Sequence, residues 1–223
     1  MDAAYDQSAD WSYIMQHQDD IPPSLLKLAM HNKETIPFVS HYLRQPQNLS
    51  LDLKTDLKSQ EIPLLLQWDT RWGYRKYGDD FIAVNGCGPT CLSMVLSYLQ
   101  NNASLNPYVI AKYAYQKGYY TQAGTSWRLM DEGARCFGVN ASQMPLNEDM
   151  IKQELDQHHP IICSVGPGIF TTEGHFIVLR EYKNGLIYVN DPNSRQHSQK
   201  GYRFDEIKNQ IKNLWVYSKE KNR

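Results

Sequence analysis

The segment that most constrains the fold is an apolar helix that begins directly after a Gly-Cys-Gly-Pro sequence. Apolar residues recur there at the three- and four-residue spacing of a single helix face: Leu92, Val95, Leu96 and Leu99. Pro89 suits the first turn of a helix, where a backbone N–H is not needed for the helical hydrogen bonds. The pattern predicts a helix over residues 88–100 that is buried on one side and carries Cys87 at its N-terminus.

The order of the remaining signals predicts an α+β fold. Helical spacing is found in three further segments, 107–117, 126–137 and 148–158. The last third of the chain has the composition of strands at 161–165, 175–182, 186–191 and 214–217. A short strand is also expected earlier, at 62–67, and the apolar run 81–84 precedes a turn at Asn85-Gly86. Helices followed by antiparallel strands are typical of α+β domains.

The first 60 residues differ in character from the rest of the chain. They are polar and irregular, with two short helical signals at 24–31 and 34–43. With 223 residues the chain is long enough for one large domain with an appendage, whose core needs neither disulfides nor a structural metal. We therefore expect an N-terminal helical arm over 1–60 and a single domain over 61–223.

Charge and hydropathy exclude two classes of partner. Lys and Arg number 23 against 24 Asp and Glu, a net charge of -1, whereas a protein that binds nucleic-acid phosphates needs a basic excess on some face. The longest aliphatic stretch, Leu64-Leu65-Leu66, is far shorter than a membrane span. We expect no nucleic-acid partner and no membrane-spanning segment. For location we expect the cell exterior or cell surface after removal of an export signal, with the cytoplasm left open.

Cys87 is placed for nucleophilic chemistry. The macrodipole and the unpaired backbone N–H groups at a helix N-terminus stabilise the thiolate, which is the nucleophilic form of cysteine. The flanking Gly86 and Gly88 would let a substrate backbone approach closely. Cys91 lies one turn further into the helix, where the dipole acts less, and is expected to be a packing residue. The alternative for Cys87 is a buried cysteine at a helix start.

A thiolate needs a base or cationic partner, and His175 is the histidine best placed for that role. It opens an expected strand directly after the Gly-containing loop 166–174, so it lies at the rim of the sheet. The other histidines lie in polar segments or at a helix end and are expected to face solvent: His17, His31, His41, His158, His159 and His197. A purely structural role for His175 is the alternative.

Asp191 is the candidate to orient that histidine. The turn Asn184-Gly185 makes antiparallel neighbours of the strand that begins at His175 and the strand that ends at Asp191. If the apolar faces of the two strands coincide, Asp191 lies on the same side as His175. Across a two-residue turn, residues of the two strands that lie on the same face have numbers that differ by an odd value. The numbers 175 and 191 differ by 16, an even value, so this match requires an odd-length turn or a bulge. A strict two-residue turn would place Asn190 there instead, and a simple Asp-Pro turn at Asp191 is a further alternative.

Four short motifs, taken together in this order, resemble those of the C39-like cysteine peptidases of the papain-like superfamily. They are Gln67-Trp68-Asp69, Gly86-Cys87-Gly88-Pro89-Thr90, Gly174-His175-Phe176-Ile177-Val178 and Asn190-Asp191-Pro192. The resemblance covers residues 61–218. It implies a papain-like α+β fold, in which a helical half bears the nucleophile and an antiparallel sheet bears the histidine and the aspartate.

The resemblance also implies a role for each matching residue. Cys87 would be the nucleophile, His175 the general base, Asp191 the residue that orients the imidazole, and Gln67 the side-chain donor of the oxyanion hole. An amide donor is chemically reasonable because the oxyanion of a tetrahedral intermediate needs preorganised N–H groups. Without the resemblance, Gln67 would be interpreted as a surface residue.

The chain departs from the bacteriocin-processing members of the family in two respects. Those members are attached to ATP-driven exporters and cut leader peptides after a Gly-Gly pair, whereas this chain has no membrane span and no GxxxxGK[ST] phosphate loop. They also tend to have Asp before the cysteine, where this chain has Gly86. The chain looks more like the free-standing bacterial branch, which is often exported.

The leading hypothesis is therefore a cysteine peptidase that acts on a peptide or protein substrate without a cofactor. Trp127 and Gly174 are candidate substrate-binding residues, Trp127 having a core position as its alternative. Two other functions stay open: a cell-wall peptide amidase with the same triad, and an inactive peptide-binding module. A zinc site is disfavoured because the sequence has no CxxC, HExxH or HxH motif.

Overall fold

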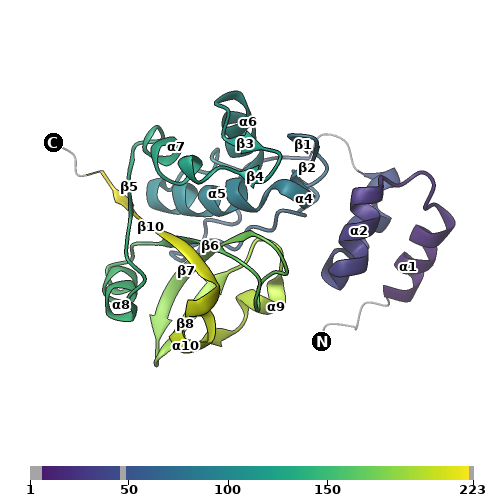
Figure 1. Cartoon of the computed structure of the whole chain (residues 1–223). Coiled ribbons are helices and arrows are strands. Elements are labelled where there is room, and N and C mark those ends of the chain that lie inside the picture. Colours follow the sequence, from purple (N-terminus) through teal and green to yellow (C-terminus); the bar gives the residue numbers. More distant parts are fainter. Residues whose placement is uncertain (1–6, 46–48, 221–223) are drawn as a thin grey trace.

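The protein is built around one six-stranded antiparallel sheet, seen in a computed structural model that describes residues 7–45 and 49–220 (Figure 1). The strand order is β5-β10-β6-β7-β8-β9, and every neighbouring pair is antiparallel. The strands are β5 (Val139–Gln143), β6 (Ile161–Val165), β7 (His175–Lys183), β8 (Leu186–Asn190), β9 (Gly201–Tyr202) and β10 (Ile211–Lys219). The predicted strands at 161–165, 175–182 and 186–191 are confirmed to within a residue, and the strand at 214–217 lies inside the longer β10.

The predicted apolar helix is confirmed as α5 (Cys87–Gln100). It ends at Asn101, whose left-handed backbone (φ 48°) closes the last turn of the helix. The predicted helices at 107–117 and 148–158 correspond to α6 (Pro107–Gln116) and α8 (Glu148–Asp156), each capped by an asparagine side chain. Both lie where their spacing predicted.

Two hydrophobic clusters lie on the two faces of the sheet. One cluster joins α5 and α6 to residues such as Ile162, Phe176 and Trp215. The other joins α8 to residues that alternate with these along the same strands, such as Cys163 and Ile177. Because β6 and β7 contribute side chains to both clusters, the middle of the sheet is buried on both faces. The first residue of β7, His175, is therefore held at the end of a rigid strand.

The strand predicted at 62–67 is wrong, because this segment belongs to no strand of the structure. The apolar run 81–84 begins with the last residue of β2 (Asp80–Phe81) and continues into the short helix α4 (Ile82–Asn85). The Gly86 N–H closes this helix by donating to the Ile82 carbonyl. A short apolar run does not by itself distinguish a buried strand from other buried segments.

Two further differences concern the middle of the chain. The predicted helix at 126–137 is interrupted at Asp131, whose backbone is not helical, and is divided into η3 (Trp127–Leu129) and α7 (Glu132–Arg135). Strands β5 and β9 were not predicted because each is too short or too polar to show a clear alternation. The remaining short elements are β1 (Lys76–Tyr77), β3 (Tyr120–Thr121), β4 (Gly124–Thr125), α9 (Arg195–Ser198), α10 (Phe204–Ile207) and η4 (Lys208–Gln210).

The N-terminal arm is helical, as expected, but contains more helix than the sequence indicated. The predicted helix at 24–31 is α2 (Pro23–His31), and the signal at 34–43 is divided among η1 (Lys33–Thr35), α3 (Ile36–Ser40) and η2 (Tyr42–Arg44). Helix α1 (Gln7–Gln16) was not predicted, because its apolar residues are too few to mark a face. The division of the chain at residue 60 stays a prediction.

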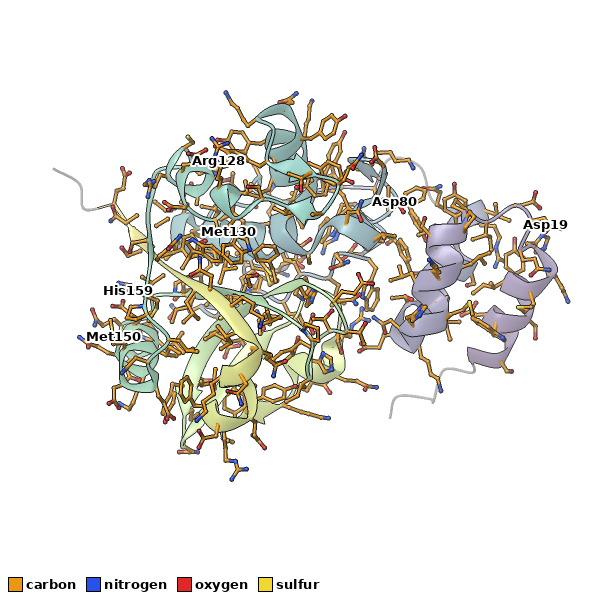
Figure 2. The ribbon with its side chains drawn as sticks, viewed as in Figure 1. Asp19, Asp80, Arg128, Met130, Met150 and His159 are labelled. Atoms are coloured by element: carbon orange, nitrogen blue, oxygen red, sulfur yellow. The ribbon has the colours of Figure 1, made fainter. Side chains whose placement is uncertain are left out.

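The arm is attached to the rest of the protein by packing and by hydrogen bonds. Phe38 of α3 stacks on Tyr74 with ring centroids 4.1 Å apart, and the Tyr74 hydroxyl donates to the Phe38 carbonyl at 2.6 Å. The Ser24 hydroxyl donates to Asp80 at 2.8 Å, and Figure 2 shows Asp80 on the side of the main domain that faces the arm. In the part of the chain that the structure describes, no helix is long and apolar enough to cross a bilayer.

The hairpin β7–β8 has both a two-residue turn and a bulge. Asn184 and Gly185 have positive φ values, 54° and 78°, as a tight hairpin turn requires. The pairing then shifts by one residue between Leu179 and Glu181. Beyond the bulge, Val178 pairs with Asn190, so the next pair in this register sets Asp191 opposite Ile177. Asp191 thus follows the strand on the face of His175, as the bulge alternative predicted.

The side chain of Asn190 lies on the opposite face of the hairpin and hydrogen-bonds to residues 62 and 63. Its side-chain N–H groups donate to the carbonyls of Ile62 and Pro63, each at 3.1 Å. Asn190→Ala leaves those carbonyls without this donor, so we expect the free energy of unfolding to fall by about 2 kcal/mol in chemical denaturation. Asn140→Ala, which removes exposed hydrogen bonds on β5, should change it by less than about 0.5 kcal/mol. Equal losses in the two variants would contradict the argument.

Candidate active site

Cys87 lies at the junction of two helices. Helix α4 ends at Asn85, Gly86 follows, and Cys87 is the first residue of α5. The backbone N–H groups of the first turn of a helix have no partners within it, and the positive end of the macrodipole lies there. The thiol is partly exposed. Cys87 is therefore reachable and lies at the N-terminus of a helix, where the sequence predicted it.

The two glycines beside Cys87 are required by packing and not by substrate access. A Cβ on Gly86 would lie 2.4 Å from the Ile82 carbonyl oxygen, and one on Gly88 would lie 2.8 Å from the side chain of Thr125. Both glycines are buried, so their α-carbons face the protein interior. The expectation that they open the cleft to a substrate backbone is wrong, because the space they leave is already filled.

His175 is the residue that connects Cys87 to Asp191. The side chain is 8% exposed, and its Nε2 lies 2.8 Å from Oδ1 of Asp191. The Cys87 side chain also lies near enough to the imidazole to act on it. A carboxylate only accepts hydrogen bonds, so Nε2 carries a hydrogen and Nδ1 is the nitrogen left for the thiol. In the neutral ring Nδ1 is then the basic nitrogen, as a general base for Cys87 requires.

The electrostatics favour a charged imidazole. Burial alone would lower the pKa of His175, but the charge and hydrogen bond of Asp191, together with those of Cys87, raise it well above its usual value. Burial would likewise raise the pKa of Asp191, but His175, His197 and the Asn193 N–H lower it to about 2. The two directions agree, because each group stabilises the charged form of the other.

Asp191 is fully buried and is surrounded by donors. Its Oδ1 accepts from His175 and from the Asn193 backbone N–H, both at 2.8 Å, and its Oδ2 accepts from His197 Nδ1 at 2.7 Å. The bond from Asn193, two residues further on, closes an Asx turn. The Asp-Pro turn considered as an alternative is therefore present, but it coexists with the contact to His175.

The expectation that His197 faces solvent is wrong. It lies on α9, six residues after Asp191, and bonds to that carboxylate. One sequence signal could have indicated this: Ser194 caps α9 by accepting from the His197 backbone N–H, and such a cap brings the chain back toward the turn at Asp191. His159 is also paired, with Glu154 at 2.7 Å, instead of being simply solvated.

Gln67 is brought to the segment that precedes Cys87, and its amide is engaged there. Nε2 donates to the carbonyl of Ala83 at 2.8 Å and to that of Val84 at 3.3 Å. Within the described residues its Oε1 is buried without a hydrogen-bond partner. To donate to an oxyanion, the amide would have to give up the longer bond, to Val84. The role of Gln67 in an oxyanion hole stays a prediction.

The two predicted substrate-binding residues differ in what the structure shows. Trp127 is 47% exposed and packs edge-on against buried Trp215, with ring centroids 5.6 Å apart. Trp215 in turn contacts Phe176, the neighbour of His175. A Cβ on Gly174 would meet nothing within 4 Å, so no close packing requires glycine there. Substrate binding by Trp127 and Gly174 stays a prediction.

The charge of His175 can be tested directly by the pH dependence of its ring ¹⁵N shifts in NMR spectra. Because its pKa is raised, the imidazolium should persist as the pH rises through the usual 6.5 and be lost only well above it. Asp191→Asn removes the negative charge, so burial should then bring the pKa of His175 down. Asp205→Asn, which removes an exposed carboxylate paired with Lys208, is the control and should leave the titration unchanged. Titration of wild-type His175 at or below 6.5 would contradict the electrostatic argument.

The chain is similar to known proteins in sequence and in fold. The model of the family described as Peptidase_C39 like matches residues 59–222. No curated protein matches the chain. A solved structure from Bacillus anthracis described as a C39-like peptidase is 13% identical, covers 78% of this chain and 100% of its own, and has a TM-score of 0.50. This likeness concerns the fold.

Two further solved structures are more distant in fold. The peptidase domain of Streptococcus ComA, a bi-functional ABC transporter involved in a quorum-sensing pathway, is 19% identical and covers 61% of this chain and 93% of its own, with a TM-score of 0.45. A double glycine motif protease from an AMS/PCAT transporter, in complex with the leader peptide, is 19% identical and covers 59% of this chain and 82% of its own, with a TM-score of 0.40. The expected papain-like α+β fold is confirmed, and the chain belongs to the Peptidase_C39-like family of cysteine peptidases.

Proposed function

We propose that this protein hydrolyses peptide bonds through a triad of Cys87, His175 and Asp191. The observation that carries the proposal is the imidazole of His175, which hydrogen-bonds to the buried carboxylate of Asp191 and lies near enough to Cys87 to interact with it. Asp191 and Cys87 raise the pKa of His175. The raised pKa stabilises the imidazolium, which is the cationic partner that a thiolate needs. The family of the chain supports the same chemistry.

Acylation uses both members of this pair. The Sγ thiolate of Cys87 attacks the carbonyl carbon of the scissile peptide, and the carbonyl oxygen takes the negative charge of a tetrahedral intermediate. As the intermediate collapses, the C–N bond breaks and His175 Nδ1 gives its proton to the leaving amine. A thioester to Cys87 remains. Asp191 stays ionised and holds the ring through Nε2.

Deacylation repeats these steps with water. The neutral ring of His175 takes a proton from water at Nδ1, and the hydroxide attacks the thioester carbonyl. Collapse of the second intermediate breaks the C–S bond and releases the acid. The proton stays on His175, so the thiolate–imidazolium pair is restored. The unpaired N–H groups at the start of α5 are suited to stabilise both oxyanions, and Gln67 would add a donor if its amide released Val84.

Alkylation tests the nucleophile without knowledge of the substrate. At neutral pH, iodoacetamide should modify Cys87 faster than the other three cysteines, as measured by mass spectrometry of the native protein. Cys91 and Cys163 are buried, and burial raises the pKa of both thiols. Cys136 is exposed, more so than Cys87, so exposure alone predicts faster labelling of Cys136. His175→Ala should slow labelling at Cys87 and leave the rate at Cys136 unchanged. Equal rates at Cys87 and Cys136 in the wild type would overturn the proposal.

Covalent trapping separates an enzyme from a binding module. A peptide aldehyde or vinyl sulfone should form an adduct at Cys87 in the wild type and none in Cys87→Ser. Binding of the same peptide without an adduct would indicate an inactive peptide-binding module. Cleavage of a peptide library, compared with that of purified muropeptides, then distinguishes a peptidase from a cell-wall amidase.

Gln67→Ala tests the predicted oxyanion donor. Loss of one preorganised donor typically lowers turnover by about 100- to 1000-fold, so we expect such a loss in cleavage of library-derived peptides while Cys87 stays selectively alkylated. Gln157→Ala, on the exposed end of α8, is the control. If the amide of Gln67 only braces Ala83 and Val84, the variant will lose stability but keep the turnover of its folded fraction.

A further inference from the structure

The carboxylate of Asp191 is shared between two histidines. His175 takes Oδ1 and His197 takes Oδ2, at 2.8 and 2.7 Å. The proposed catalysis uses only the first of these contacts. The second is as short and is made by a side chain on a different element, α9. Because Asp191 is ionised and only accepts, Nδ1 of His197 must be the donor in this bond.

His197 is itself held in place on several sides. Its ring packs edge-on against Phe170, with centroids 5.6 Å apart. Its backbone N–H donates to the Ser194 hydroxyl oxygen at 3.1 Å, and its carbonyl accepts from the Tyr202 hydroxyl at 3.1 Å. Ser198, the next residue, donates its hydroxyl to the Ser194 carbonyl at 2.7 Å. The imidazole therefore has one available orientation toward the carboxylate.

The N-terminal arm holds the start of α9. Oε1 of Glu34 accepts from the Ser194 hydroxyl at 2.6 Å and from the Gln196 backbone N–H at 3.3 Å, while its Oε2 accepts from the Arg195 backbone N–H at 2.9 Å. Asn32, beside it in sequence, donates to the Asn193 carbonyl at 2.6 Å. The arm thus bonds to successive residues of the loop between Asp191 and His197.

We propose that His197, held by Glu34 of the arm, is a positioning residue for Asp191: it fixes the rotation of the carboxylate so that Oδ1 faces His175. The inference rests on the proposed function, because it assigns His197 a part in the same triad. A carboxylate can turn about its Cβ–Cγ bond unless both oxygens are bonded. With Oδ2 bound to His197, Oδ1 stays directed at His175 and at the Asn193 N–H.

The expected effect on His175 has a definite sign. Asp191 stabilises the imidazolium, so a carboxylate that turns away lowers the pKa of His175. The imidazolium is then lost at a lower pH than in the wild type. Titratable groups on several elements act on this network: Cys87 and Cys91 of α5, His175 of β7, Tyr202 of β9 and Glu34 of η1. Each variant must therefore be compared over a full pH titration.

The test uses two substitutions of His197 in the whole protein. His197→Phe keeps a ring against Phe170 but removes the donor. His197→Asn restores one, because the side-chain nitrogen of Asn lies near the position of Nδ1. The readouts are the ¹⁵N titration of the His175 ring and the rate at which iodoacetamide alkylates Cys87. In the Phe variant we expect a fall of about one unit in the pKa of His175, which is a tenfold change in its proton equilibrium, and slower alkylation of Cys87.

His159 supplies a matched control. Its Nδ1 lies 2.7 Å from Glu154, with an exposure close to that of His197, and Figure 2 shows it beside α8 on the side away from the arm. His159→Phe removes the same kind of pair and should leave both readouts unchanged. Glu34→Ala, which releases α9 but keeps His197, should shift the His175 titration in the same direction by a smaller amount. It also tests the proposal if the Phe variant does not fold.

Three results would overturn the inference. In the first, His175 titrates in the His197→Phe variant as it does in the wild type, even if the variant is less stable. His197 would then only support the fold. In the second, His197→Asn is as defective as His197→Phe, so the hydrogen bond is not the cause. In the third, Glu34→Ala leaves His175 unchanged, so the arm has no part in positioning. Unselective alkylation of wild-type Cys87 would instead defeat the proposed function, while the His175 titrations would still decide the role of His197.

Discussion

The rest of the structure depends on the burial of one charge, the carboxylate of Asp191. A buried carboxylate is costly unless donors replace the water it loses. Asp191 is fully buried, and its donors come from β7, from the turn that follows it and from α9. Each of these segments must be folded in position for the buried carboxylate to be stabilised. The charge in turn raises the pKa of His175, which is the electrostatic condition for a thiolate at Cys87.

This requirement explains the irregularity of the β7–β8 hairpin. A two-residue turn alone would have directed Asn190, and not Asp191, to the face of His175. The one-residue shift beyond Leu179 exchanges the two, so Asp191 faces the imidazole and Asn190 faces the opposite side. There Asn190 holds the carbonyls of Ile62 and Pro63 in the segment that leads to Gln67. One bulge therefore sets both the proposed triad and the approach of the predicted oxyanion donor.

The parts of the site that the sequence predicted are those with local signals. Helix α5 follows from its apolar spacing, and the position of Asp191 follows from strand parity once a bulge is allowed. The contacts of His197 and Glu34 were not predicted, because they join residues through tertiary packing and leave no periodic pattern. The helix turn in segment 81–84 was not predicted for a related reason: a short apolar run is compatible with a buried strand or a buried helix turn, and tertiary contacts decide between the two.

The arm supports the candidate site from two directions. Leu66 and Trp68, the neighbours of Gln67, belong to the same hydrophobic cluster as α2 and α3, and so does Ala83, whose carbonyl accepts from the Gln67 amide. Glu34 meanwhile bonds to the loop that follows Asp191. Loss of the arm would therefore expose the apolar surface behind Gln67 and release the loop of the triad aspartate at the same time. Although the catalytic motifs all lie beyond residue 60, the packing that holds Gln67 and Asp191 includes side chains from the first 45.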